Sequence, residues 1–541
     1  MNTKKDRWRL HVHHLKATLS AQTASVSPSA TAYVSARLHC QPHTKGQPCI
    51  IDGRPSRNWD DFLLYIDEAH SVSHYNDLNS LLSRLVSLFL LFSLEKGYGL
   101  HDEKTRQNDF HTIQIRSLLP ASVCNSSTSG HSKKATLKVV HKHGPCSHLS
   151  LDKANVPNVT QILSEDQSRV NLIHFRLSSD SAQNNILKSS KATLPVNSGA
   201  SIGTGNFVVT VGLGTPKKDL TLVFDTGSDL TWTQCQPCLG SCYQQEEPIF
   251  NPNESTTYKN ISCNSAECTQ LTSDAGGVMK RCSNSSICIY GIGKDTLTLT
   301  PTDVLPNFRF GCGQSNHGLF GGAAGLLGLG RNQLSVVSQT SSMYQKYFSY
   351  CLPSASSSTG HLTFGKGGPS SALKLNFTPF SRNSKNPSFY FVHITGIKVG
   401  GRKLSIAKSV FKNTTSIIDS GTVITRLPPA IYSALRTAFR RKMTNYPMTK
   451  GLPLLDTCYD LSNNKTVLMP KISFYFQGNV EVPIYPTGIL FGHSISQVCL
   501  AFAGNSNASD VGVFGNNQQK TLEVAYDVAG GKLGFGTGGC S

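Results

Sequence analysis

The chain has 541 residues and a net charge of +19, and only 15% of its residues are charged. A chain of this length is too long for one hydrophobic core, so a single-domain protein is excluded and two or more domains are expected. Short alternating apolar runs are frequent and long helical patterns are scarce, which predicts a mostly β protein.

Residues 1–80 match no recognisable domain pattern, and we interpret them as a gene-model or alternative-exon extension. Within residues 81–99, the run Leu85–Phe92 is typical of the apolar core of a secretory signal peptide and is too short to span a bilayer as a helix. Its position is unusual, because such a signal belongs at the start of a chain. A real extension, such as a plastid transit segment, is the alternative; the acidic residues of the extension argue against it, namely Asp60, Asp61, Asp67 and Glu68.

Residues from about 100 to 200 are polar and poor in regular apolar pattern. Three histidines here are candidate metal ligands, but solvated side chains are the simpler interpretation: His141, His143 and His148. Beyond residue 200, runs such as Phe207–Val211 and Phe389–Ile394 predict strands. One helix is predicted over Pro429–Met443, where apolar residues recur at fourfold spacing.

Two tetrapeptides carry the clearest chemical signal. Asp225–Ser228 (Asp-Thr-Gly-Ser) follows the apolar run Leu220–Phe224, and Asp419–Thr422 (Asp-Ser-Gly-Thr) follows Ser416–Ile418. The glycine lets the backbone turn tightly and point an N–H at the acid, and the hydroxyls can hydrogen-bond the carboxylate. Two such loops predict a duplicated lobe with one Asp from each half. Facing carboxylates share a proton, so one acts as a general base on water while the other donates to a carbonyl.

Sixteen cysteines are present, twelve of them after residue 200, and an even dozen in an extracellular type of domain predicts six disulfides. The twelve are Cys235, Cys238, Cys242, Cys263, Cys268, Cys282, Cys288, Cys312, Cys351, Cys458, Cys499 and Cys540. The Cys235-x-x-Cys238 spacing also fits zinc or redox chemistry, but no second paired motif accompanies it, so we expect no metal. One pair, Cys312–Cys351, is a guess. Seven glycosylation sequons are consistent with secretion: Asn253, Asn260, Asn284, Asn376, Asn413, Asn464 and Asn507.

From Asn206 to Cys540 the chain resembles the pepsin-like aspartic endopeptidases. The resemblance implies a mostly β, bilobal fold with the active-site cleft between an N-terminal lobe (201–380) and a C-terminal lobe (381–541). It implies that Asp225 and Asp419 are catalytic, that no cofactor is needed and that Cys458 pairs with Cys499. Supporting roles in and beside the two loops are implied for Thr226, Gly227, Ser228, Trp232, Ser420, Gly421 and Thr422.

The Cys-rich insert after Trp232–Cys238 resembles that of the plant nepenthesin-like group, including relatives described as chloroplast nucleoid DNA-binding proteases. This resemblance implies a zymogen whose propeptide (100–200) is removed between about Ser189 and Asn206. Basic propeptide residues would cover an acidic cleft until its carboxylates are protonated, so acid would trigger activation. Protein or peptide substrates, a monomer without a membrane span, and an extracellular, apoplastic or vacuolar location are implied, with a plastid as the alternative.

One departure from the family pattern concerns the flap, the hairpin whose Tyr closes over bound substrate. Cys288–Ile292 runs straight into Gly293, so the Tyr-Gly-Asp hairpin is missing. A flap-deficient pseudoprotease that binds proteins is therefore the first alternative. A DNA-associated basic protein is the second, although a solvated helix face is the simpler interpretation of the densest basic cluster: Arg436, Arg440, Arg441 and Lys442.

Overall fold

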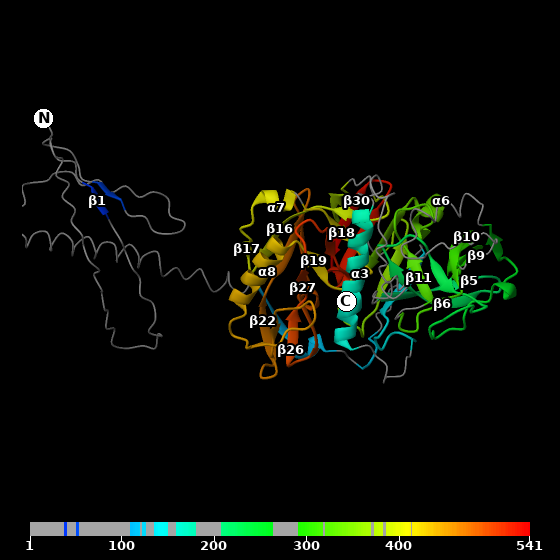
Figure 1. Cartoon of the computed structure of the whole chain (residues 1–541), viewed down its shortest axis with the longest axis horizontal. Helices are drawn as coiled ribbons and strands as arrows, with labels where there is room; N and C mark the ends of the chain where they lie inside the picture. The colour runs from blue at the N-terminus through cyan, green and yellow to red at the C-terminus, as the bar shows by residue number, and fades with distance from the viewer. Residues whose placement is uncertain are drawn as a thin grey trace, which may run out of the picture. The chain divides into compact units, whose positions relative to one another are not determined.

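The structure is a computed structural model of the whole chain (Figure 1). It divides into two units, residues 1–100 and 101–541. The residues it describes are 37–39, 50–52, 109–119, 122–125, 135–149, 158–179, 207–262, 290–316, 320–368, 373–381, 386–412 and 414–540. In the first unit these form β1 (Arg37–His39), which pairs antiparallel with β2 (Ile50–Asp52). The signal-like segment 81–99 lies outside the described residues.

The second unit is built mainly from strands, as expected for a mostly β protein. Its largest sheet has thirteen strands in the order β14-β30-β29-β12-β13-β4-β5-β6-β11-β7-β10-β9-β8. In that order the strands are Asn376–Pro379, Lys532–Thr537, Leu522–Asp527, Tyr347–Cys351, Gly360–Phe364, Thr136–His141, Phe207–Leu213, Lys218–Asp225, Gly325–Gly328, Trp232–Gln234, Asp303–Gly313, Tyr290–Thr300 and Lys259–Ile261.

Four smaller sheets complete this unit, in the orders β15-β18-β28-β19-β27, β17-β16-β23-β24, β20-β21-β26-β25 and β22-β3. In the same orders, their strands are Phe391–Val392, Ser416–Ile418, Gly512–Phe514, Thr425–Leu427 and Phe502–Gly504; Arg402–Lys403, Ile394–Val399, Ile472–Phe476 and Val480–Pro483; Met448–Thr449, Cys458–Tyr459, Gln497–Leu500 and Leu490–Ser494; Thr466–Pro470 and Phe110–Gln114. Because the largest sheet takes β29 and β30 from the end of the chain, the lobe boundary near residue 380 stays a prediction.

The predicted strands and the predicted helix are confirmed. β5 and β6 form an antiparallel hairpin whose turn includes Gly214 at φ +83°, in the left-handed region that favours glycine. Helix α8 (Pro429–Lys442) buries Ile431, Leu435 and Phe439 on one face. The remaining helices of the described residues are α3 Val159–Ser179, α5 Val336–Gln339, α6 Ser341–Tyr344, α7 Lys408–Lys412, α9 Pro486–Ile489, α10 Asn516–Gln519, and the 3-10 turns η1 Ile115–Leu118 and η3 Pro252–Glu254.

The segment that precedes the protease pattern contributes to the core although it is poor in regular apolar pattern. β4 lies between β13 and β5 in the largest sheet and buries Leu137 and Val139, and β3 pairs with β22. Two alternating buried residues are enough to keep β4 in the sheet, because the neighbouring strands on both sides supply its backbone hydrogen bonds. The same segment forms α3, the 21-residue helix drawn in cyan between the green and the yellow-to-orange strands (Figure 1).

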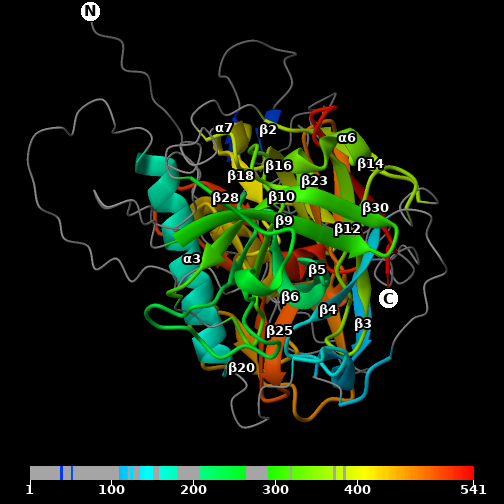
Figure 2. The same cartoon turned by 90° about the vertical axis from the view of Figure 1, so that its right-hand side faces the viewer.

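Helix α3 lies along one side of this unit (Figure 2). The side chain of Asn158 accepts a hydrogen bond from the Gln161 N–H at 2.8 Å, which caps the start of the helix. Its buried face carries residues three or four positions apart: Leu163, Asp166, Arg169, Val170 and Ile173. Leu163 and Ile173 pack into two apolar clusters formed by the C-terminal part of the chain. The helix is therefore anchored at two points along its length.

The disulfides correct one predicted pair and confirm another. Cys312 pairs with Cys235 instead of Cys351, because the parallel pairing of β10 with β7 places Cys312 opposite Thr233, two residues before Cys235. Cys351 pairs with Cys540, and the predicted pair Cys458–Cys499 is confirmed. The other two disulfides of the described residues are Cys238–Cys242 and Cys124–Cys146. The remaining cysteines of the Cys-rich insert lie outside the described residues: Cys263, Cys268, Cys282 and Cys288.

β9 is a continuous strand at the point where the family pattern places the flap. Ile292 and Gly293 are consecutive members of the strand and pair with Gly311 and Phe310 of β10. No hairpin therefore interrupts the described part of this strand. Among the same described residues, no helix is both long and apolar enough to cross a membrane.

Candidate active site

Each predicted catalytic Asp stands at the end of a strand flanked by a parallel neighbour. Asp225 is the last residue of β6, where it lies opposite Gly328 of β11, and Asp419 directly follows β18, which pairs with β28. Both carboxylates are buried, with 1% and 0% of the residue exposed. The parallel neighbours that support the two acids are therefore β11 and β28.

The residues after the two aspartates bind the loops to each other. The Thr226 N–H donates to the Ser420 hydroxyl at 3.0 Å, and the Ser420 N–H donates to the Thr226 hydroxyl at 2.9 Å. The Ser420 hydroxyl also lies 3.3 Å from the Phe224 carbonyl oxygen, to which it donates. This reciprocal pair of hydrogen bonds fixes the two loops face to face although 194 residues separate them.

Glycine is required at the third position of each loop, because the opposite carboxylate approaches it closely. The Gly227 N–H donates to Asp225 Oδ1 at 2.9 Å, and the Gly421 N–H donates to Asp419 Oδ1 at 3.0 Å. A Cβ on Gly227 would stand 2.6 Å from Asp419 Oδ1, and one on Gly421 would overlap Asp225. Any larger residue would therefore push the carboxylates apart.

The fourth residues of the two loops differ. The Thr422 hydroxyl donates to Asp419 Oδ2 at 2.6 Å, as the resemblance implied. On the other side, Ser228 Oγ and Asp225 Oδ2 are both buried and find no hydrogen-bond partner among the described residues.

A residue that the sequence analysis did not single out occupies the space between the carboxylates. The Arg169 guanidinium of α3 is buried, and its terminal nitrogen Nη2 donates to Asp225 Oδ1 at 2.7 Å and to both oxygens of Asp419 at 3.0 Å. Its Nε donates to Asp419 Oδ2 at 3.1 Å. One cation thus bridges two facing carboxylates.

Burial and charge act in opposite directions on this pair. Burial and the negative charge of Asp225 raise the pKa of Asp419, and the positive charge of Arg169 lowers it. The result is a pKa of about 6. Burial also raises the pKa of Asp225, but Arg169 and hydrogen bonds from neighbouring groups outweigh it and hold that pKa below its usual value. The two carboxyl groups are therefore inequivalent while Arg169 lies between them.

A second buried ion pair lies one helical turn away on the same face of α3. Asp166 Oδ1 accepts from the Val423 N–H at 2.6 Å, and Oδ2 accepts from the Ile424 N–H at 3.1 Å and from Arg426 Nη2 at 3.0 Å. Both side chains are almost fully buried, at 0% for Asp166 and 1% for Arg426. Helix α3 therefore contacts the loop that carries Asp419 through two charged residues.

Comparison with known proteins gives one consistent family. Two family models match, described as the N-terminal region of xylanase inhibitors over residues 207–366 and the C-terminal region over residues 389–537. An aspartyl protease family protein of Arabidopsis thaliana is 51% identical over 472 residues, which is 84% of this chain and 99% of the relative. This chain belongs to the plant aspartyl proteases.

One relative and one solved structure are more distantly similar to this chain. Nepenthesin-2, an aspartic proteinase of Nepenthes gracilis, is 35% identical over 60% of this chain and 76% of its own length. Among solved structures, basic 7S globulin from soybean is 20% identical, with a TM-score of 0.48 over 63% of this chain and 92% of that one. On the family models and its strand-rich sheets, the protease has the mostly β, pepsin-like fold that the sequence predicted.

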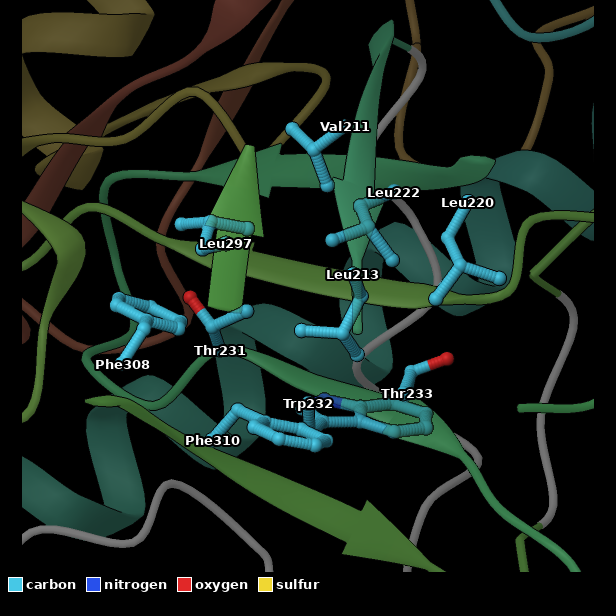
Figure 3. A pocket seen from close by; sticks show the side chains of 10 residues that line it. All are labelled: Val211, Leu213, Leu220, Leu222, Thr231, Trp232, Thr233, Leu297, Phe308 and Phe310. Carbon is cyan, nitrogen blue, oxygen red and sulfur yellow. The ribbon is translucent and has the colours of Figure 1, made fainter. Parts of the chain in front are cut away.

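One pocket of the described residues is apolar. Trp232 packs edge-on against Phe320 and lines a small cavity inside the N-terminal part (Figure 3). Its other lining residues are Val211, Leu213, Leu220, Leu222, Thr231, Thr233, Leu297, Phe308 and Phe310. Both threonine hydroxyls already bond to backbone groups of the Gly325–Gly328 region. With no charged group in its wall, the cavity is part of the core and not the catalytic cleft.

Other candidate sites of the protease have structural roles in the described residues. Cys235, Cys238 and Cys242 are in disulfides, and no group of three or more described His, Cys, Asp or Glu side chains is arranged to hold a metal. In the basic cluster on α8, Arg436 and Arg440 form ion pairs with Asp456. The described sequons are exposed except for the half-buried Asn464: Asn253, Asn260, Asn376 and Asn507; Asn284 and Asn413 lie outside the described residues.

Proposed function

We propose that this chain is the latent precursor of an acid-activated aspartic endopeptidase, with Asp225 and Asp419 as its catalytic residues. The observation that carries the proposal is the Arg169 guanidinium, hydrogen-bonded to both carboxylates at 2.7–3.1 Å. While it occupies this position, no water can lie between the two acids. Residues 100–200 then serve as the propeptide, and their removal opens the cleft.

In the open site, the two carboxyl groups share one proton. The ionised group takes a proton from a bound water as its oxygen attacks the peptide carbonyl, and the protonated group donates to the carbonyl oxygen. The resulting tetrahedral diol collapses when the leaving nitrogen is protonated, which breaks the peptide bond. Thr226 and Ser420 keep the two acids at a fixed separation during these steps, through the hydrogen bonds between their loops.

The acid dependence follows from the charge of Arg169. At Asp225 this charge, with hydrogen bonds from neighbouring groups, outweighs burial and holds the pKa below its usual value, so that pKa rises when α3 leaves. At this group the open form binds more protons than the closed form, and acid favours opening. The stabilisation of the closed form is lost as the pH falls from the usual carboxyl range towards the lowered pKa of Asp225, so opening is expected to increase in that range. Burial raises the pKa of Asp419 to about 6 and that of Glu165 to about 7, and opening relieves this burial, so these two groups act in the opposite sense at higher pH.

The test is an acid incubation of the full chain, followed by an assay with a denatured protein substrate and a statine-type transition-state analogue as inhibitor. We expect cleavage that begins only after acid exposure and is blocked by the inhibitor. Failure of the acid-treated chain both to cleave and to bind the inhibitor would contradict the proposal. Binding without cleavage would favour the second candidate, a pseudoprotease that binds proteins, for which the continuous strand β9 is the specific support.

Insertion of a relative's Tyr-Gly-Asp hairpin between Ile292 and Gly293 is expected to raise kcat/KM on the order of 100-fold. A flap excludes water and holds an extended substrate against the catalytic pair, and poor positioning alone can cost about this factor. The melting temperature should change little, because the pairing of β9 with β10 continues on both sides of the insertion point. A serine-glycine insertion of equal length is the control. Equal rates for native and hairpin-bearing chains would show that β9 needs no flap.

The cellular location is part of the proposal. Five disulfides in the described residues require an oxidising compartment, and four of the sequons are exposed. We therefore place the protease in the secretory route, with an extracellular or vacuolar destination.

A further inference from the structure

The donors that hold Asp166 form a preorganised site for a carboxylate. Three of them surround it: the backbone N–H groups of Val423 and Ile424, and the guanidinium of Arg426. All three belong to the segment that follows Asp419, while Asp166 belongs to α3. The Asp166 carboxylate therefore comes from the propeptide, whereas its binding site is formed by residues of the protease itself.

Arg426 has Asp166 as its main side-chain partner. Its Nη1 donates to the Ile424 carbonyl oxygen at 2.7 Å, and its Nη2 donates to Asp166 and, at 3.4 Å, to the side-chain oxygen of Gln167. Its Nε has no hydrogen-bond partner among the described residues. Asp166 is also the one described carboxylate within ion-pair distance of this guanidinium. When α3 leaves, Arg426 and two backbone N–H groups lose their acceptor together.

An unpaired charge in a largely buried site is costly, so these donors will favour another carboxylate over a neutral side chain. The site is also close to the reacting bond. Asp166 precedes Arg169 by three residues, a rise of about 4.5 Å along the helix, and an extended peptide advances about 3.3 Å per residue. A substrate bound across the two aspartates therefore passes the site within a few residues of the bond that is cut.

We propose that Arg426, with the N–H groups of Val423 and Ile424, forms an anion-binding subsite that selects peptide substrates with an aspartate or glutamate near the scissile bond. This inference rests on the proposed function and adds a substrate class to it. The propeptide uses the same subsite through Asp166, so autoinhibition and substrate selection share one set of donors.

The primary test needs no variant. The acid-activated full chain is given pairs of peptides at about pH 5. The two peptides of a pair differ only by Asp or Asn, which is placed in turn at each of several positions on both sides of the cleaved bond. We expect Asp to raise kcat/KM by about 10- to 100-fold at one position, the range for hydrogen bonds to a charged group. Cysteic acid, whose sulfonate stays ionised in acid, should keep this advantage at about pH 3, where that of Asp declines as its carboxylate is protonated.

Variants then assign the preference to Arg426. In Arg426→Gln the ratio of the Asp to the Asn rate should fall towards one, and in Arg426→Lys it should be partly retained, because the positive charge remains. Arg441→Gln, at an exposed arginine of α8, is the control for loss of a charge and should leave the ratio unchanged.

The outcomes separate the two proposals. Equal rates for Asp and Asn peptides at every position in the wild type would overturn the subsite and leave the proposed protease intact. If no peptide is cleaved, binding of statine-containing peptides with Asp or Asn is measured instead. Tighter binding of the Asp form would support the subsite while contradicting the catalytic function, and equal binding, or none, would overturn the subsite.

Discussion

Asp225→Asn and Asp419→Asn are each expected to lower kcat/KM of the acid-activated chain by about 10²- to 10⁴-fold, the usual contribution of general acid–base catalysis. An amide can neither accept the proton of the attacking water nor share a proton with the opposite carboxyl group. Because each substitution preserves the size of the side chain, the loops should stay in place. The measurement is the rate of cleavage of a denatured protein between pH 2 and 8.

Asp219→Asn is the matched control, since Asp219 lies on the same strand β6 as Asp225 but is exposed and pairs with Lys217. This variant should retain full activity. Undiminished cleavage by either variant of the catalytic pair would show that the assignment of Asp225 and Asp419 is wrong.

Arg169→Gln is expected to remove most of the latency of the full chain. Breaking a buried ion pair costs about 3–5 kcal/mol, which is more than a 100-fold change in the ratio of closed to open molecules. The two carboxyl groups would then share a proton with each other instead of binding a cation. At pH 7 a statine-type inhibitor should bind Arg169→Gln at least about 100-fold more tightly than the wild type, and the difference should shrink at pH 4.

The control is Asn171→Ala, at an exposed position of α3, which should bind the inhibitor as weakly as the wild type at pH 7. If Arg169→Gln excludes the inhibitor at pH 7 as completely as the wild type does, then contacts of α3 other than Arg169 are the main interactions that keep the cleft closed.

The catalytic loops could be predicted from the sequence because their signal is local. An apolar strand, an acid, a hydroxyl residue and a glycine follow one another within eight residues at Asp225, and the pattern recurs at Asp419. Helix α8 was equally accessible, since Ile431, Leu435 and Phe439 show its period directly.

The contacts of α3 could not be predicted in the same way. The buried face of α3 includes Asp166 and Arg169, and charged residues at buried positions hide an amphipathic pattern. Their burial makes sense only with partners some 250 residues away, at Asp419 and Arg426. The spacing of Leu163, Asp166, Val170 and Ile173 was the available signal, but it required ion pairs that a sequence alone does not show.

The disulfides also differ in whether their partners could be predicted from the sequence. Cys458 and Cys499 face each other across β21 and β26, and family position identified them. The partner of Cys312 depends on the parallel pairing of β10 with β7, and the partner of Cys351 depends on where the end of the chain lies. Neither depends on local sequence, so the guessed Cys312–Cys351 pair was wrong.

The most direct test of latency is the activity of the wild-type full chain before and after exposure to acid. One sample is kept at pH 7 and another is incubated at pH 4, and both are assayed for cleavage of a denatured protein while their N-termini are sequenced. The account predicts an inactive chain at pH 7, and after acid an active one that begins between about Ser189 and Asn206. Full activity at pH 7 with α3 still attached would contradict it, as would a chain that stays inactive after the propeptide has been removed.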